Sequence, residues 1–170
     1  KKMARAIVRY KGPVYVRINR NDLPVFTESG GEYEIGRMYP VFGQEGRSDV
    51  VIFASGVMVG NAVEAAERLS AEGVPVQVIN VSTLKPLAAG EILKYAAGAR
   101  LAVSAEESVK TGGLGQALAS VLLESPNPPL FRQLAIEDAF GASAHTYEEL
   151  LDRYGLSADH VYMAVKKALS

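Results

Sequence analysis

Short apolar runs alternate with apolar positions at helical spacing along the chain from residue 50 onward. Val50–Ala54 is an unbroken apolar run, which is typical of a strand covered on both faces. Residues 59–69 then place apolar side chains at i, i+3, i+4 and i+7, the spacing of one helix face. The same alternation predicts strands over 74–81, 101–105 and 130–136, helices over 86–96 and 115–123, and two final helices capped at Thr146 and Ser157.

Strands that alternate with helices in this way predict right-handed crossovers and a parallel sheet with helices on both faces. We expect a three-layer α/β/α fold, mostly parallel and doubly wound, with about five strands. Tyr33–Phe42 holds a further strand candidate, expected as an antiparallel edge strand paired with the strand that follows it. Doubly wound sheets commonly place the first and third strands side by side, so Ser55-Gly56 and Glu106-Glu107 are expected to face each other.

The hydrophobic pattern of residues 1–21 is typical of the last helix and strand of another domain. Met3–Val8 has the spacing of a last helix, a Gly-Pro stop follows, and residues 14–18 alternate as a strand does. One helix and one strand cannot bury their apolar faces alone. We therefore expect 1–21 to be the terminal helix and strand of a truncated domain, 22–32 a linker, and 33–170 the α/β domain. The absence of an initiator Met fits a fragment.

Composition narrows the function classes. The 170 residues are 48% hydrophobic and only 22% charged, which suits one packed domain and argues against disorder. A formal net charge of -1 gives no reason to expect nucleic acid or an anionic membrane as partner. The lack of Cys excludes disulfides and thiol nucleophiles and favours a cytoplasmic setting. No apolar run approaches the roughly 18 residues of a membrane span.

The stretch Leu101–Gly115, LAVSAEESVKTGGLG, joins a strand end, paired carboxylates and a glycine cluster ahead of a helix. A loop between a strand end and a helix N-terminus often binds a ligand, because the first amides of a helix lack intrahelical partners. Nucleotide binding is disfavoured, since no dinucleotide or P-loop pattern occurs and Glu106 and Glu107 would repel phosphate. Neighbours at a strand end point to opposite sides, so these two are expected to be surface or interface charges and not a catalytic pair.

The sequence contains no recognisable catalytic motif. His145 and His160 lack the spacing of a metal motif, and we expect surface or capping roles for them. Ser104, Ser108 and Thr111 have no nearby histidine and no nucleophile elbow. We therefore predict no catalytic residue, metal ligand or cofactor ligand in this chain.

Two arginines near the N-terminal strand are the candidates for ligand contact. Arg17 lies on the polar face of the predicted strand, and Arg20 lies at its C-terminal end, the edge where α/β sheets bind ligands. The planar guanidinium group suits phosphate. Ordinary linker-proximal charges are an equally supported interpretation from these residues alone.

From Tyr33 to the end, the ordered series of motifs resembles the C-terminal domain of transketolase. The matching segments are DVVIFASG, VMVGNAVEAAERLSAEG, VPVQVINVSTLKP, LAVSAEES, TGGLGQALA and AFGASAHTYEELLDRYGLS. The chain is most similar to the second polypeptide of split transketolases, in which the enzyme is divided between two chains. GPVYVRINRNDLP similarly resembles the last strand of the family's pyrimidine-binding domain and the linker after it.

The resemblance implies a parent enzyme that transfers two-carbon ketol units between phosphosugars in the pentose phosphate pathway. Thiamine diphosphate and magnesium would be its cofactors, an N-terminal transketolase chain or domain its partner, and a dimer or other homo-oligomer its assembly. The family's diphosphate-binding GDG…N motif and the pyrimidine-domain segment with the activating glutamate do not occur here. The chain alone is therefore expected to hold no cofactor and to be inactive.

The resemblance also assigns roles to single residues. Arg20 matches the arginine of the transketolase pattern S-R-x-N-L and would contact the substrate phosphate, with Arg17 as a second such contact. The family's C-terminal domain largely supports subunit contacts. We therefore expect the acidic and glycine loops to lie at an interface through Glu106, Glu107, Gly112 and Gly113.

Two alternatives stay open. The phrase Thr83-Leu84-Lys85-Pro86 and the C-terminal ending favour transketolase over deoxyxylulose-phosphate synthase and the β subunits of 2-oxoacid dehydrogenases, whose C-terminal domains are related. The second alternative belongs to another class, a stand-alone dimerisation module or one that binds a small ligand in the crevice of the sheet.

Overall fold

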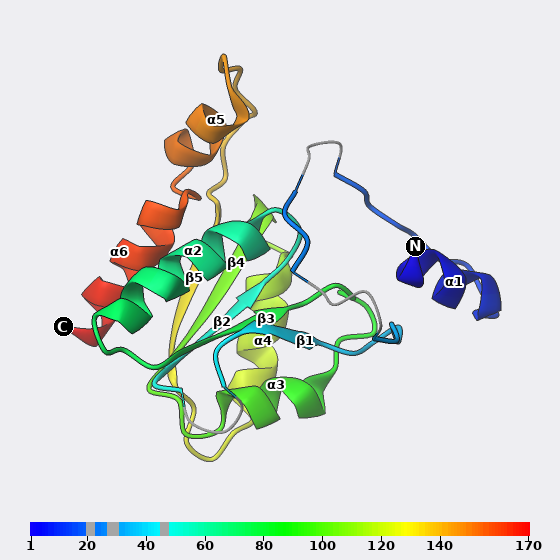
Figure 1. Cartoon of the computed structure of the whole chain (residues 1–170), viewed down its shortest axis with the longest axis horizontal. Helices are drawn as coiled ribbons and strands as arrows, with labels where there is room; N and C mark the ends of the chain where they lie inside the picture. Colours follow the sequence, from blue (N-terminus) through cyan, green and yellow to red (C-terminus); the bar gives the residue numbers. More distant parts are fainter. Residues whose placement is uncertain (20–22, 27–30, 45–47) are drawn as a thin grey trace.

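The computed structural model describes residues 1–19, 23–26, 31–44 and 48–170. Figure 1 shows its elements in chain order. They are α1 (Lys2–Arg9), β1 (Tyr39–Phe42), β2 (Val50–Ala54), α2 (Met58–Ala71), β3 (Val76–Asn80), α3 (Ala89–Ala96), β4 (Leu101–Val109), α4 (Leu114–Leu122), β5 (Leu130–Ile136), α5 (Tyr147–Arg153) and α6 (Ala158–Leu169).

The described residues form one five-stranded sheet in the order β1-β3-β2-β4-β5. β2 pairs in parallel with both β3 and β4, β4 pairs in parallel with β5, and only β1 runs antiparallel to its neighbour. The expected α/β fold, with a mostly parallel doubly wound sheet and an antiparallel edge strand, is confirmed. The first and third strands of the βα series are indeed neighbours, with Ala54 opposite Ala105.

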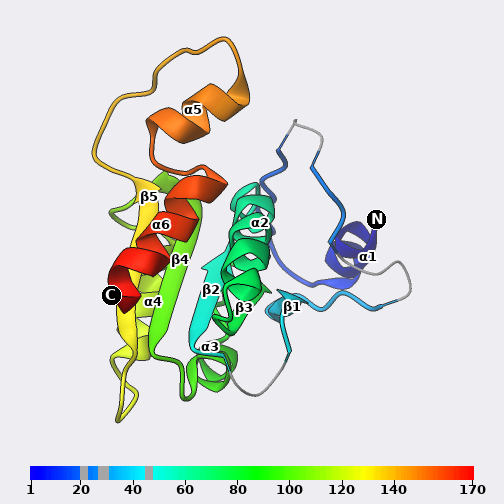
Figure 2. The ribbon, with the colours of Figure 1, turned by 60° about the vertical axis from the view of Figure 1, so that its left-hand side comes forward.

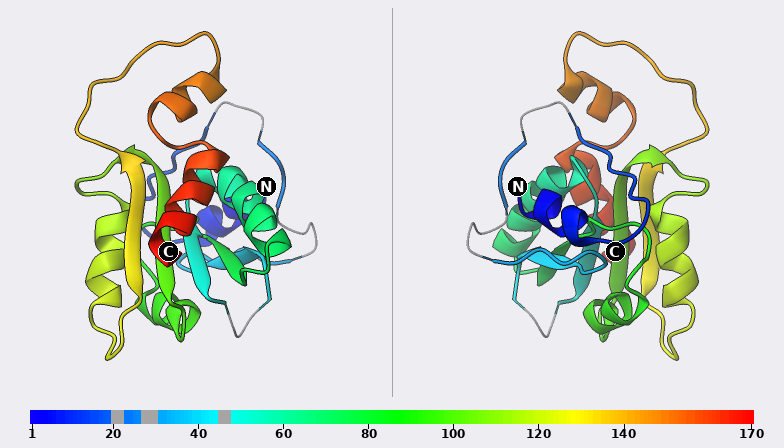
Figure 3. Two further views of the ribbon diagram at one scale, coloured as in Figure 1. Left: turned by 90° about the vertical axis from the view of Figure 1, so that its left-hand side faces the viewer. Right: turned by 90° about the vertical axis from the view of Figure 1, so that its right-hand side faces the viewer.

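Helices cover both faces of the sheet (Figures 2 and 3). α2 and α6 pack on one face, where side chains such as Ile52, Leu69 and Val161 are completely buried. α3 and α4 pack on the other face around Phe53 and Leu118. Alternate residues of each central strand therefore feed two separate apolar cores, as expected for a strand buried on both sides. None of the described helices is long and apolar enough to cross a membrane.

The edge strand has a different partner from the one predicted. β1 pairs with β3, through Tyr39 opposite Asn80, and not with the next strand in sequence. β2 already has a neighbour on each side, so no free edge is left for β1 there. Pro40 lies in β1, which fits an edge position because proline has no N–H for a ladder bond.

The N-terminal segment contains the predicted helix but not the predicted strand. α1 ends at Arg9, and residues 14–18 pair with no strand among the described residues. Side chains with strand-like alternation, such as Tyr15 and Ile18, are 90% and 84% exposed. An alternating pattern produces a strand only where another strand can supply the hydrogen bonds.

β4 is longer than the sequence predicts. The strand was expected to end at Ala105 because two glutamates follow, yet it continues through both of them to Val109. β5 continues beside it, with Ile136 opposite Val109 after a register shift. β4 therefore extends past the end of β2 at Ala54, and the two carboxylates lie on this extension.

The caps of the last two helices were predicted partly correctly. The Thr146 hydroxyl accepts from the Glu149 amide at 3.2 Å, as an N-cap should. The Glu149 carboxylate accepts from the His145 amide at 3.0 Å, one residue away from the usual capping-box partner. Ser157 stands at the N-cap of α6, but its hydroxyl lies 2.7 Å from Nδ1 of His160 and makes no backbone cap.

Ser104 provides a first test of the packing. Its side chain is completely buried in β4, and its hydroxyl has no hydrogen-bond partner in the described part of the chain. Burying an unpaired hydroxyl costs about 1–3 kcal/mol, so Ser104→Ala should leave the free energy of unfolding unchanged or raise it by up to ~1 kcal/mol. Urea denaturation measures this change.

Ser108→Ala is the matched control for that substitution. The Ser108 hydroxyl donates to the Glu106 carboxylate at 2.6 Å, so its removal should lower the free energy of unfolding by about 1 kcal/mol. Equal destabilisation by the two variants would mean that the Ser104 hydroxyl has a partner after all.

Candidate functional site

Glu106 is buried and closes the N-terminus of α4. Its side chain is 3% exposed, and its two carboxylate oxygens accept from the amides of Leu114 and Gly115 at 2.6 and 2.8 Å. The Ser108 hydroxyl donates to the same carboxylate, and Gln133 Nε2 lies 3.3 Å from it. The open helix terminus that the sequence suggested as a ligand site is therefore occupied by a carboxylate of the chain itself.

The glycines of this loop allow the carboxylate to come close. A Cβ on Gly113 would lie 2.5 Å from a Glu106 carboxylate oxygen, and one on Gly115 would lie 2.3 Å from Cδ of Gln133. Gly112 adopts φ +78°, and its amide donates to the Gln116 side chain at 2.8 Å. A surface role is thus wrong for Glu106, whereas the interface role predicted for Glu106, Glu107, Gly112 and Gly113 stays a prediction.

A surface cavity of about 510 Å³ lies on the other side of the β4 extension. Three parts of the chain that are far apart in sequence form its walls: the N-terminal tail, the end of β4, and the segment that leads into α5. Figure 3 shows α5 beyond the carboxyl ends of β4 and β5. The lining residues are Arg17, Ile18, Asn19, Glu107, Ala144, His145, Thr146, Tyr147 and Leu150.

Glu107 connects two walls of this cavity. Its carboxylate accepts from the Tyr147 hydroxyl at 2.7 Å and lies 3.8 Å from a guanidinium nitrogen of Arg17. Partial burial of Tyr147, together with its hydrogen bond to Glu107, raises the pKa of that hydroxyl well above its ordinary value. Hydrogen bonding with Asn19 and the charge of Arg17 oppose the rise in pKa. The hydroxyl stays protonated at neutral pH and donates to Glu107.

The structure brings some of the residues predicted as sites together: Arg17 lies beside Glu107, and Gly113 lies beside Glu106. Arg17 lines the cavity, whereas Arg20 lies outside the described residues. His145 also lines the cavity, and His160 of α6 contacts the N-cap residue Ser157. No group of three or more histidine, aspartate or glutamate side chains with metal-binding geometry occurs in the described ranges.

Sequence reasoning missed Tyr147 as part of this site. The capping pattern placed Tyr147 in the first turn of a helix, and nothing in that pattern pointed to a partner forty residues earlier in the chain. Asn19 was missed for the same reason. Both depend on how α5 and the N-terminal tail meet the end of β4, which is a tertiary contact without a local signal.

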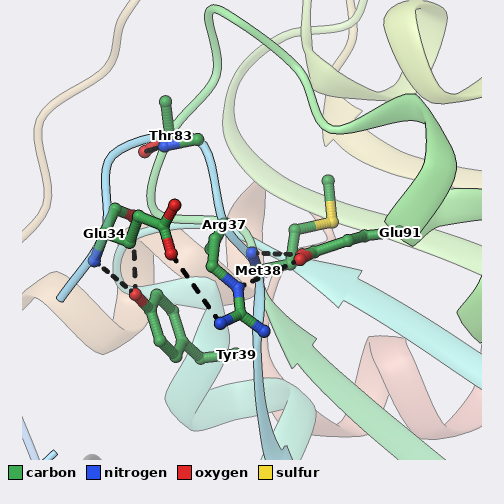
Figure 4. Close-up of polar contacts among 7 residues, drawn as sticks. Glu34, Arg37, Met38, Tyr39, Thr83 and Glu91 are labelled. Atoms are coloured by element: carbon green, nitrogen blue, oxygen red, sulfur yellow. Dashed lines mark hydrogen bonds and ion pairs between the residues drawn. The ribbon is translucent and has the colours of Figure 1, made fainter. Parts of the chain in front are cut away.

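A second polar cluster anchors the segment that enters β1, as Figure 4 shows. Glu91 of α3 accepts from Arg37 Nε at 3.2 Å and from the Met38 amide at 2.6 Å. The hydrogen bond to Glu91 raises the pKa of Arg37. The Gly36 amide donates to the Thr83 hydroxyl at 3.1 Å. These groups satisfy one another, so the cluster fixes the path of the chain into β1 and offers no reactive group.

Known proteins match this chain over most of its length. The profile described as "Transketolase, C-terminal domain" matches residues 42–161. A putative uncharacterised transketolase family protein of Sinorhizobium fredii is 39% identical over 96% of this chain and 47% of the relative. The 6-deoxy-6-sulfo-D-fructose transketolase subunit SqwH of a Clostridium species is 35% identical over 93% of this chain and 48% of that subunit.

Solved structures agree with these relatives. A structure described as "Split gene transketolase, inactive beta4 tetramer" superposes with a TM-score of 0.86 at 38% identity, over 99% of this chain and 55% of that one. A 2-oxoglutarate:ferredoxin oxidoreductase from Magnetococcus marinus, 21% identical with a TM-score of 0.55 over 81% of this chain and 20% of that one, shares the fold. The chain spans about half the length of the curated relatives described above.

Proposed function

Because the chain belongs to the transketolase C-terminal domain family, we propose that it is the C-terminal part of one subunit of a split transketolase. The complete enzyme would transfer two-carbon ketol units between phosphosugars with thiamine diphosphate as cofactor. In this proposal the chain supports subunit assembly and borders the active site. The reaction itself needs the partner polypeptide and the rest of this subunit.

The observation that carries the proposal is the similarity to the split-gene transketolase chain. The match covers nearly all of this chain but only 55% of the other, and it includes the N-terminal tail as well as the α/β domain. That coverage supports the division into a piece of another domain at 1–21, a linker at 22–32 and the C-terminal domain at 33–170. The exposed apolar side chains of the tail, Tyr15 and Ile18 among them, fit the same division.

The start of α4 does not fit the diphosphate of thiamine diphosphate. The diphosphate group needs backbone amides or a metal held by carboxylates. The amides at the start of α4 are taken by Glu106, and no cluster of metal-ligand side chains occurs in the described part of the chain. The contribution proposed for this chain is recognition of the substrate phosphate by Arg17 and Arg20.

Reconstitution tests the proposed function. The subunit that contains this chain is mixed with the polypeptide that completes the enzyme, and ketol transfer between phosphosugars is followed with thiamine diphosphate and magnesium. We expect no transfer by either component alone and activity that saturates at a fixed ratio of the two. Isothermal titration of this 170-residue chain with thiamine diphosphate and magnesium should show no binding.

Two outcomes would contradict the proposal. Tight cofactor binding by this chain alone would show that it holds a site of its own. A stable complex that condenses pyruvate with glyceraldehyde phosphate but transfers no ketol unit would assign the chain to a related synthase.

A further inference from the structure

Asn19 attaches the N-terminal tail to the α/β domain. Residues 10–18 are exposed, whereas Asn19 is partly buried, and its side chain forms a hydrogen bond with the Tyr147 hydroxyl. That hydroxyl gives its one hydrogen to the Glu107 carboxylate, which only accepts, so Asn19 donates through its amide nitrogen. The Tyr147 hydroxyl thus joins the tail to the end of β4, and we call this contact the tyrosine anchor.

The Arg17–Glu107 ion pair adds little to this attachment. The Arg17 side chain is 67% exposed, and its guanidinium nitrogen lies 3.8 Å from the carboxylate. Solvent screens an ion pair of this kind, and both side chains lose freedom when it forms. The hydrogen bonds of the Tyr147 hydroxyl are therefore the contact to test.

Phe26 attaches the linker to α2. Among the described linker residues 23–26, Leu23 and Val25 are 38% and 86% exposed, whereas Phe26 is partly buried and packs on the core at the α2 side of the sheet. The Phe26 ring lies 3.7 Å from the position that a Cβ on Gly60 would take, in the first turn of α2. Glycine is a poor helix former, but here its lack of a side chain leaves room for the ring. We call this contact the phenylalanine anchor.

We propose that the two anchors fix both ends of the linker on the α/β domain, so that the linker does not act as a free hinge. Only residues 20–25 separate Asn19 from Phe26. A short segment attached at both ends has far fewer conformations than a flexible linker of the same length. If residues 1–21 belong to another domain, the anchors also set how that domain is oriented. This last consequence rests on the proposed function, whereas the anchors themselves are tested on this chain.

The chain contains no Cys, so spin labels can be attached at introduced cysteines alone. Tyr15→Cys combined with Glu67→Cys places one label on the tail and one on the exposed face of α2. Val25→Cys combined with Glu67→Cys places the first label on the linker instead. Pulsed electron paramagnetic resonance measures the distance distribution of each pair. We expect one narrow distribution for each pair when both anchors are intact.

Tyr147→Phe tests the tyrosine anchor. Without the hydroxyl, the tail is held only through Phe26, and the distances of the Tyr15–Glu67 label pair should spread over roughly 15–20 Å, the size of a flexible coil of that length. Tyr154→Phe is the matched control. Its hydroxyl donates to the Phe140 carbonyl at 2.9 Å, so the distribution should stay narrow in this variant.

Gly60→Leu and Phe26→Ala test the phenylalanine anchor in two independent ways. A leucine at position 60 competes with the Phe26 ring for space, and Phe26→Ala removes the ring without changing α2. Both should broaden the distance distribution of the Val25–Glu67 label pair. Gly60→Ala is the matched control, because its Cβ would make an ordinary van der Waals contact with the ring and leave it in place.

Three results would overturn the inference. The first is a broad distribution for either pair with both anchors intact, and the second is a narrow distribution in every variant. The third is broadening in Tyr147→Phe alone, which would mean that the linker is attached at one end only. These distances are measured without cofactor, partner polypeptide or turnover. Failure of the anchors is therefore distinguishable from failure of ketol transfer in the reconstituted enzyme.

Discussion

Glu106→Ala is expected to lower the free energy of unfolding by about 3 kcal/mol, because buried amide donors are left without an acceptor. The amides of Leu114 and Gly115 and the Ser108 hydroxyl all donate to this carboxylate in the folded chain. For a domain of this size the loss corresponds to a fall in Tm of roughly 10 °C. Thermal and urea denaturation followed by circular dichroism measure both quantities.

Two further variants identify the cause of the loss. Glu106→Gln keeps the side-chain shape but turns an NH2 group toward one of the amide donors, so it should recover only part of the stability. Glu67→Ala removes an exposed glutamate on α2 and should change the free energy of unfolding by less than about 0.5 kcal/mol. If Glu106→Ala were as mild as Glu67→Ala, the carboxylate would not be holding the start of α4.

Gly43→Ala is expected to be at least as damaging, with a loss of about 4 kcal/mol from strain and steric overlap together. Gly43 follows β1 with φ +82°, and an added Cβ would lie 2.3 Å from the Val76 carbonyl oxygen. That atom belongs to the backbone at the start of β3, where Val76 pairs with Val50 of β2, so Gly43 would have to move instead and would loosen the pairing of β1 with β3. Loss of this pairing should also expose the edge of β3, which proteolysis can detect.

Gly73→Ala isolates the strain contribution. Gly73 has φ +81°, almost the same as Gly43, but an added Cβ there meets nothing within 4 Å. Gly73→Ala should therefore lower the free energy of unfolding only by the strain of a left-handed backbone conformation, about 1 kcal/mol. Equal losses in the two variants would show that β1 moves aside and that close approach to Val76 does not limit this position.

Two strands of the fold could be predicted with their bounds from local pattern, whereas the pairing of the edge strand β1 could not. Val50–Ala54 and Leu130–Ile136 were predicted with the observed bounds, because turn-forming or charged residues flank each segment. The partner of β1 depends on which strand edge is left free after β2 is paired on both sides, and only the complete sheet decides this. The segment 14–18 has the pattern of a strand but lacks a partner among the described residues.

The candidate site was harder to predict because its key side chains break local rules. Two adjacent glutamates normally end a buried strand, yet Glu106 is tolerated in β4 because a helix eight residues later supplies the donors. Arg17 was recognised from its chemistry, and it does line the cavity. Tyr147 could not be recognised, since its partner Glu107 lies forty residues away and the contact forms only in the folded chain.

The Glu106 carboxylate at the start of α4 also competes with free anions for the first amides of this helix. Glu106 is joined to the helix through only a few residues of chain, so its effective concentration at those amides is on the order of millimolar or higher. A free phosphate compound would have to displace Glu106 from these amides. The buried Glu106 carboxylate would then lose its hydrogen-bond donors. The domain thus carries its own permanent occupant at the helix terminus where related sheets take up phosphates.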